Sequence, residues 1–180
     1  MGVNSSGYLA AEEDVVRRNF RNRRWLKRNE RWGVIIPFVS RSRLILSVGG
    51  GAVEPTIINA THCVDIVPIV GHYLKLLKWN GYFRACSCTD IPAPNKYFDV
   101  AVCCEVIEHL PSIDDVKKTF KEVDRVAKRW IFTTPANPLG PMNPEPDHKR
   151  SFTIEELKTL TSKYKAEVFR SGNYHYVKKT

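Results

Sequence analysis

Near its middle the sequence reads FDVAVCCEVIEHL, from residue 98 to residue 110. The first seven residues are nearly all apolar, which is typical of a central parallel strand that helices cover on both faces. Glu105, Glu108 and His109 follow where this strand would end. Open parallel sheets bind their ligands outside the carboxyl ends of their strands, so this stretch predicts a buried strand with a ligand site at its end.

Short apolar runs and helical patterns alternate on both sides of that stretch. Seven strands are predicted in all, over residues 44–48, 62–65, 82–86, 97–104, 130–133, 166–170 and 174–178. The last two flank Ser171-Gly172-Asn173, which is typical of a hairpin turn. The alternation predicts a doubly wound, Rossmann-like α/β fold with a mostly parallel seven-stranded sheet and a terminal antiparallel hairpin.

Helical patterns lie between these strands. One covers residues 68–79, and capping boxes at Ser112 with Asp115 and at Thr153 with Glu156 begin two more. The core-facing stripe of the helix after Ser112 is predicted to be Ile113, Val116, Phe120, Val123 and Val126.

The composition fits one globular domain. The chain has 180 residues, of which 43% are hydrophobic and 26% are charged, and this excludes a disordered chain. No run approaches the roughly 18 apolar residues that a membrane span needs, and no signal peptide is recognisable. The five cysteines are odd in number and lack CxxC spacing, which argues against a disulfide framework or a zinc site. We therefore expect a cytoplasmic protein.

The formal net charge of +9 arises within one stretch. Ten basic residues and a single acid, Glu30, lie between Arg17 and Arg43. We expect residues 1–43 to form a basic N-terminal helical arm or lid, and residues 44–180 to form the ligand-binding domain. Aromatic side chains interleave with the basic ones over residues 17–43, which favours contact with nucleic acid. The alternative is an amphipathic helix that covers the ligand site while its arginines stay solvated.

A glycine turn follows the first predicted strand, at Gly49, Gly50 and Gly51. Such a turn lets the backbone approach a ligand closely and directs N–H groups at its anionic end. Asp65 ends the second strand, where an acid can accept hydrogen bonds from both hydroxyls of a ribose. Together, the turn and the acid favour an adenosine-containing ligand.

From about Leu44 to Leu160 the chain resembles the class I S-adenosylmethionine-dependent methyltransferases. The resemblance rests on the run from Ile91-Pro92 through Phe98-Asp99 to Glu-Val-x-Glu-His at residues 105–109, and it continues through residues 122–126 and 131–135. It implies that the domain binds S-adenosylmethionine and transfers its methyl group, leaving S-adenosylhomocysteine.

The resemblance also implies ten cofactor-binding positions, which are Gly49, Gly50, Gly51, Asp65, Ile66, Ser87, Cys88, Asp90, Cys104 and Glu105. The three glycines would lie along the methionine part of the cofactor, and Cys104 and Glu105 would lie beside the methionine and the transferred methyl group. Asp65 would bind the ribose, and Ile66 would lie against the adenine ring. Either Ser87, with Cys88 beside it, or Asp90 would meet the adenine amino group.

Three features depart from the family pattern. Ser47 replaces the usual acid before the first glycine, and Val53 replaces the third glycine of the turn. The stretch from Gly51 to Asp65 leaves barely a turn and a half of helix. The first two departures weaken the expected cofactor affinity without abolishing it, because the backbone does much of the binding.

Glu105, Glu108 and His109 share one face of a helical turn, and His148 follows downstream. This pattern is similar to two groups within the superfamily, the RNA 2′-O-methyltransferases of small-RNA 3′ ends and the O-methyltransferases of ubiquinone synthesis. In those groups a Glu-x-x-Glu-His turn and a later histidine bind a divalent metal that grips the substrate hydroxyl. The resemblance thus implies a metal site of Glu105, Glu108, His109 and His148, suited to Mg²⁺, Mn²⁺, Zn²⁺ or Fe²⁺.

The alternative is a turn that Glu108 and His109 brace without a metal. The catalytic candidates are then His109 as general base and Glu105 beside the methyl group.

The predicted function is methyl transfer from S-adenosylmethionine to an acceptor, either a small molecule or RNA. The metal interpretation favours a hydroxyl acceptor. Two other functions stay open at this point. One is an inactive module of the same fold that binds nucleic acid through residues 17–43, and the other is a nucleotide-dependent oxidoreductase that binds NAD.

Overall fold

Seven strands form one sheet in the order β3-β2-β1-β4-β5-β7-β6. The computed structural model describes residues 16–18, 21, 29–136 and 147–180. The first five strands pair in parallel, and β7 runs antiparallel to both of its neighbours, β5 and β6. This arrangement confirms the predicted doubly wound sheet with its terminal hairpin. The strands are β1 (Ile45–Val48), β2 (His62–Asp65), β3 (Tyr82–Ala85), β4 (Phe98–Cys104), β5 (Ala127–Pro135), β6 (Glu167–Ser171) and β7 (Tyr174–Lys179).

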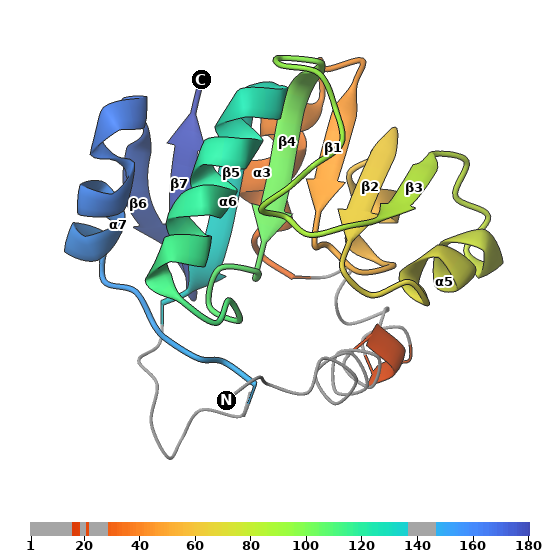
Figure 1. Ribbon diagram of the computed structural model, residues 1–180, viewed down its shortest axis with the longest axis horizontal. Helices are drawn as coiled ribbons and strands as arrows, with labels where there is room; N and C mark the ends of the chain where they lie inside the picture. The colour runs from red at the N-terminus through yellow and green to blue at the C-terminus, as the bar shows by residue number, and fades with distance from the viewer. Residues whose placement is uncertain (1–15, 19–20, 22–28, 137–146) are drawn as a thin grey trace.

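Helices cover both faces of this sheet, with α6 and α7 on the face toward the viewer and α3 behind it (Figure 1). None of the described helices combines the length and the apolarity that crossing a membrane requires. The helices are α3 (Trp32–Val39), α4 (Glu54–Ile57), α5 (Val70–Leu76), α6 (Ile113–Val126) and α7 (Ile154–Thr161), and a 3₁₀ turn, η1 (Ser162–Tyr164), follows α7.

The longest described helix, α6, begins where its sequence predicts. The Ser112 hydroxyl accepts a hydrogen bond from the Asp115 backbone N–H at 3.1 Å and donates one to the Asp115 carboxylate at 2.6 Å. Val116, Phe120 and the two later valines of the predicted stripe are fully buried. Ile113 is not, since it is 39% exposed, and its assignment to the core was wrong. In the first turn of α6 the Ile113 side chain lines a surface pocket together with Phe152 and Leu160, which leaves it partly exposed.

The predicted start of α7 is also present. Thr153 and Glu156 form a complete capping box, in which each side chain bonds the other residue's backbone. The hairpin between β6 and β7 turns at Gly172, whose φ of 56° requires the left-handed conformation that glycine adopts readily. β5 begins at Ala127, earlier than predicted, because the chain passes directly from α6 into the strand.

The opposite face of the sheet is covered by α3, which lies inside the basic N-terminal stretch. Trp32, Ile35 and Val39 are buried in a cluster with Val100 and Ile131 of the sheet. α3 is therefore a layer of the α/β fold as well as a part of the expected lid over residues 1–43.

Candidate functional site

The carboxyl ends of β1, β2 and β4 meet at one edge of the sheet, the lower edge in Figure 1. Val48 of β1 pairs with Val64 of β2, and Ser47 pairs with Val102 of β4. This register brings the glycine turn, Asp65 and the Glu105–His109 turn to the same edge, as the sequence predicts for a parallel sheet.

The glycine turn after β1 is held in place by Asp65. One carboxylate oxygen of Asp65 accepts from the Gly51 N–H at 3.1 Å, and the other accepts from the Val67 N–H at 2.9 Å. A Cβ atom on Gly49 would lie 2.6 Å from a methyl group of Val106, so the turn packs too closely against the next loop for a side chain. Asp65 thus shapes the turn, and its binding of a ribose stays a prediction.

The residues predicted to meet the adenine follow the neighbouring strands β2 and β3. Ile66 is 44% exposed beside Asp65, as a surface for a stacked ring has to be. Ser87 and Asp90 close a turn through an Asp90 N–H bond to the Ser87 carbonyl at 3.2 Å. The sulfur of Cys88 instead lies 3.3 Å from the Thr119 hydroxyl of α6. The choice between Ser87 and Asp90 for the adenine amino group stays a prediction.

Glu54, which sequence reasoning missed, lies beneath the glycine turn. It is only 2% exposed and accepts a hydrogen bond from the Ser47 hydroxyl at 2.7 Å. A Cβ atom on Gly50 would collide with both of these side chains. A carboxylate from α4 thus lies beside Ser47, the position at which the family pattern has an acid, and the signal in the sequence was an acid just after the turn and before Pro55.

Burial changes the acidity of two groups at this point of the site. It raises the pKa of the Glu54 carboxyl to about 7, against a smaller opposing effect of the Ser47 hydrogen bond. It also raises the pKa of the Cys104 thiol well above its usual range, with the Glu54 charge adding to the effect. Cys104 is therefore a neutral wall of the site at the end of β4.

Glu105 occupies a strained turn next to Cys104. Its φ is 57°, a left-handed conformation that costs a non-glycine residue about 1 kcal/mol. Its carboxylate accepts from the Thr133 hydroxyl at 2.8 Å and lies 3.8 Å from the Arg31 guanidinium. These contacts join Glu105 to β5 and to the N-terminal segment, and its place beside the methyl group stays a prediction.

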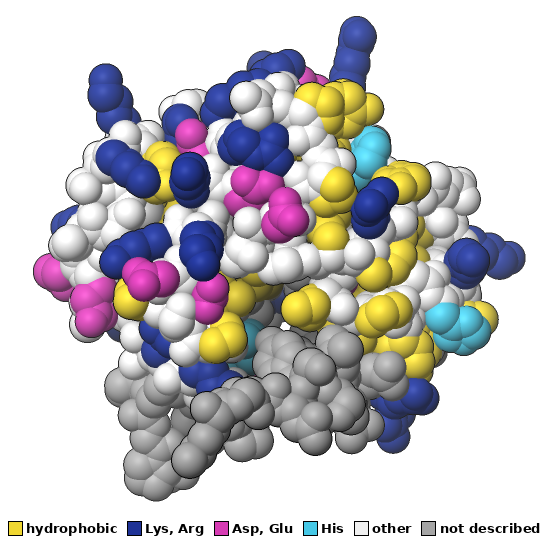
Figure 2. Space-filling model, in the orientation of Figure 1, with side chains coloured by type: hydrophobic (Ala, Val, Ile, Leu, Met, Phe, Trp, Pro, Cys, Tyr) yellow, Lys and Arg dark blue, Asp and Glu magenta, His cyan; other side chains and the backbone are white. Residues whose placement is uncertain are grey.

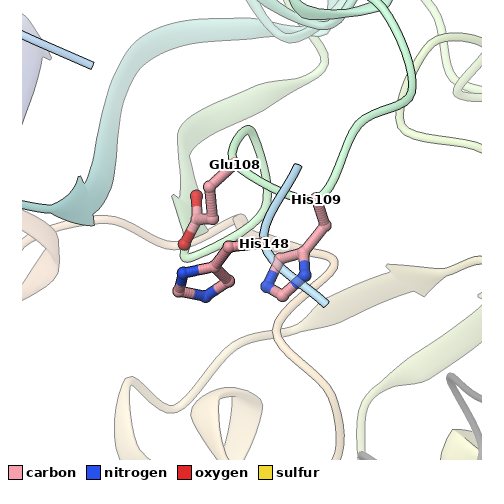
Figure 3. Close-up of side chains that lie close together, drawn as sticks. All are labelled: Glu108, His109 and His148. Atoms are coloured by element: carbon pink, nitrogen blue, oxygen red, sulfur yellow. The ribbon is translucent and has the colours of Figure 1, made fainter. Parts of the chain in front are cut away.

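Three of the four predicted metal ligands converge. The ligand atoms of Glu108, His109 and His148 lie within 4.8 Å of one another, and Figure 3 shows the carboxylate and the two imidazoles gathered together. His148 comes from a separate segment, which the Glu108 carbonyl holds by accepting from the Lys149 N–H at 2.8 Å. Glu105 lies outside this group.

The environment of this cluster suits metal ligation. Burial lowers the pKa of His109 to about 4, although Asp147, 3.4 Å from its Nδ1, partly offsets the effect. His109 is therefore neutral at physiological pH, which makes it a good ligand and a weak general base. Glu108 is 1% exposed; its Oε2 accepts from the Thr134 hydroxyl at 3.1 Å, and its Oε1 has no hydrogen-bond partner among the described residues.

Four of the ten basic residues predicted to contact nucleic acid lie outside the described residues, namely Arg23, Arg24, Lys27 and Arg28. Of the rest, Arg31 is turned into the fold. On the face shown in Figure 2, basic side chains over α6 and α7 alternate with acidic ones. Nucleic-acid contact by residues 17–43 therefore stays a prediction.

Comparison with known proteins gives consistent results. Residues 46–130 match the family model of the methyltransferase domain. No curated protein matches the sequence significantly.

Solved structures share the fold at low sequence identity. A 1,6-didemethyltoxoflavin-N1-methyltransferase from Burkholderia thailandensis, with bound S-adenosylhomocysteine, superposes with a TM-score of 0.70 at 16% identity, over 100% of this chain and 92% of that one. A SAM-dependent methyltransferase from Archaeoglobus fulgidus has a TM-score of 0.65 at 16% identity, over 87% and 94% of the two chains. The magnesium protoporphyrin IX methyltransferase of Synechocystis, with bound SAM, has a TM-score of 0.63 at 10% identity, over 85% and 79%.

The domain match runs from β1 into the start of β5. Residues 46–130 are thus similar to the methyltransferase domain family, and the chain shares its fold with S-adenosylmethionine-dependent methyltransferases of known structure.

Proposed function

We propose that this chain binds S-adenosylmethionine and transfers its methyl group to a hydroxyl of its acceptor, with a divalent metal held by Glu108, His109 and His148. The observation that carries the hydroxyl acceptor is the convergence of these three side chains at the carboxyl edge, a few residues after β4. The cofactor is supported by the match of residues 46–130 to the methyltransferase domain and by similar structures that hold S-adenosylmethionine or S-adenosylhomocysteine.

The residues of the cluster fit a divalent metal. One carboxylate and two imidazoles are donors that Mn²⁺, Fe²⁺ and Zn²⁺ accept, and Mg²⁺ would favour additional oxygen ligands. The buried Oε1 atom of Glu108, without a partner among the described residues, is a ready ligand. A bound metal would lower the pKa of the acceptor hydroxyl, which makes the hydroxyl a better nucleophile near neutral pH.

The other site residues act by binding and orientation. The glycine turn and Asp65 hold the cofactor at the end of β1 and β2, so that its methyl group lies toward β4. Cys104 and Glu105 then flank the path by which the acceptor approaches. Such positioning contributes much of the rate enhancement in a displacement at a methyl group.

The test is transfer of labelled methyl from S-adenosylmethionine to two sets of hydroxyl acceptors, small phenols and short RNAs with free 3′ ends. Turnover on the accepted set is expected to rise with Mn²⁺ or Mg²⁺. It should fall roughly 100-fold or more in chelator and in Glu108→Gln or His148→Ala. Affinity for S-adenosylhomocysteine should stay within about twofold, because the cluster lies outside the glycine turn.

His72→Ala is the matched control, since this histidine packs against Tyr73 and lies outside the cluster. Full turnover in chelator would exclude a role for the metal, and the proposal of methyl transfer from S-adenosylmethionine would stand. Absence of methyl transfer and of cofactor binding, together with RNA binding that weakens with salt, would favour the inactive nucleic-acid module instead.

A further inference from the structure

Two buried groups of opposite charge face the carboxyl edge near the glycine turn, and each has an atom without a hydrogen-bond partner. Arg31 is 9% exposed and Glu54 is 2% exposed. The Nε atom of Arg31 and the Oε2 atom of Glu54 are both buried and unpartnered among the described residues. Leaving the hydrogen bonds of such charged groups unmade is costly, so these two atoms mark a place where a polar ligand fits.

The two charges do not neutralise each other directly. Each lies within electrostatic range of the other, yet no ion pair joins them among the described side chains. The nearest acid to Arg31 is Glu105, at 3.8 Å, which is longer than a hydrogen bond. A buried ion pair stabilises a fold only when its two groups are in direct, hydrogen-bonded contact. Arg31 and Glu54 have no such contact.

Arg31 is held in this position from the other end of the chain. The Asn29 amide donates to the Tyr174 hydroxyl, and a Glu30 carboxylate oxygen accepts from the Asn173 N–H at 2.8 Å. The guanidinium carbon of Arg31 lies 4.7 Å from the centre of the Trp32 ring. The β6–β7 hairpin and α3 therefore fix the guanidinium over the edge of the sheet, so that little entropy is lost when it binds a ligand.

Glu54 is equally fixed. Its Oε1 atom accepts the Ser47 hydroxyl hydrogen at 2.7 Å, and Gly50 leaves room for the carboxylate. Gly51 has a φ of 57° and open space where a Cβ would lie, so a ligand can approach the backbone beside Glu54. A guanidinium and a carboxyl group, each preorganised and each with one unpartnered atom among the described residues, match the carboxylate and the ammonium group of an α-amino acid.

We propose that Arg31 and Glu54 bind the amino-acid end of the cofactor, the Arg31 guanidinium taking its carboxylate and the Glu54 carboxylate taking its ammonium group. This rests on the proposed function, since it requires that S-adenosylmethionine is the cofactor. In this proposal the N-terminal basic stretch contributes one cofactor-binding residue, Arg31. Helix α4 contributes the acid, Glu54, that the family pattern has at the position of Ser47.

The test compares three adenosine thioethers by calorimetric titration. S-adenosylhomocysteine has both charged groups, its decarboxylated analogue keeps only the ammonium, and 5′-methylthioadenosine has neither. Arg31→Met is expected to weaken S-adenosylhomocysteine roughly 10- to 100-fold, as loss of a charged hydrogen bond does, and to leave the other two unchanged. Glu54→Gln is expected to weaken both amino-containing ligands and to leave 5′-methylthioadenosine unchanged.

Unchanged affinity for 5′-methylthioadenosine also shows that each variant is folded. Arg41→Gln, an exposed arginine of the same basic stretch, is the control and should change none of the three affinities. Equal weakening of all three ligands, or of none, overturns the assignment while the proposed function stands. If the unaltered chain binds none of the three, the proposed function fails and the assignment fails with it.

Discussion

The buried carboxyl of Glu54 makes the stability of the fold depend on pH. Its pKa of about 7 lies above the ordinary value of 4.5, so between these values the folded chain binds more protons than the unfolded chain. Its contribution to the free energy of unfolding is therefore complete below pH 4.5 and is lost as the pH rises through 7.

Glu54→Gln removes this titration. As the pH rises from 4.5 to 8, the unaltered chain should lose roughly 3 kcal/mol of its free energy of unfolding that the variant keeps. The size follows because a tenfold change in proton affinity corresponds to about 1.4 kcal/mol. Urea unfolding at pH 5 and pH 8 measures the difference. Glu155→Gln, at an exposed position of α7, is the control. Parallel pH profiles for Glu54→Gln and the unaltered chain would contradict the argument.

At the same scale, Asp65 was predictable from the sequence and Glu54 and Arg31 were not. Asp65 is the last residue of a strand, so its position at the carboxyl edge follows from the strand alone. Glu54 reaches its place as the first residue of the short helix α4, and Arg31 is placed by the contacts that its neighbours Asn29 and Glu30 make with Tyr174 and Asn173. Neither a four-residue helix nor contacts between distant segments leave a periodic pattern in the sequence.

Among the elements, α7 depends most clearly on its capping box. The Thr153 hydroxyl accepts from the Glu156 N–H at 3.2 Å, and the Glu156 carboxylate accepts from the Thr153 N–H at 2.8 Å. Thr153→Ala should lower the free energy of unfolding by about 1 kcal/mol. The measurement is urea denaturation, with Thr159→Ala on the same helix as the control.

The Thr159 hydroxyl bonds the Glu155 carbonyl within the helix, so its loss should cost no more than about 0.5 kcal/mol. Equal losses from the two variants would show that the box does not stabilise α7.

Local signals predicted the elements better than their edges. Caps, strand runs and the hairpin glycine act within a few residues, and the structure has them where the sequence places them. Ile113 was wrongly assigned to the core, and the first residues of β5 were not assigned to the strand, because their burial and pairing depend on segments that are distant in the sequence.

At the scale of the whole molecule, the packing of α3 determines whether the basic N-terminal stretch unfolds together with the rest of the domain. Trp32 is 5% exposed against the sheet, and Ile36 on the same helix is 43% exposed. Trp32→Ala should cost about 3–5 kcal/mol, a large part of the roughly 5–15 kcal/mol that typically stabilises a domain. Ile36→Ala should change stability by no more than about 0.5 kcal/mol.

Thermal and urea unfolding of both variants measure this difference. Similar small effects at the two positions would mean that α3 docks on the sheet too weakly to be part of the fold. The predicted boundary at residue 43 rested on the charge pattern alone. That pattern reflects the arginines and carries no information about the apolar side chains between them, which pack on the sheet.

The place of β7 governs how the protein can be made. β7 follows every other strand along the chain, yet it lies between β5 and β6 in the sheet. Until the ribosome has delivered residues 174–179, β5 and β6 each present an unpaired backbone edge, which is prone to aggregation. Tyr174 is also absent until then, so the Asn29 amide next to Arg31 lacks the hydroxyl to which it donates. A nascent chain therefore completes this sheet only after residues 174–179 have been synthesised, and chaperones that shield strand edges should bind it until that moment.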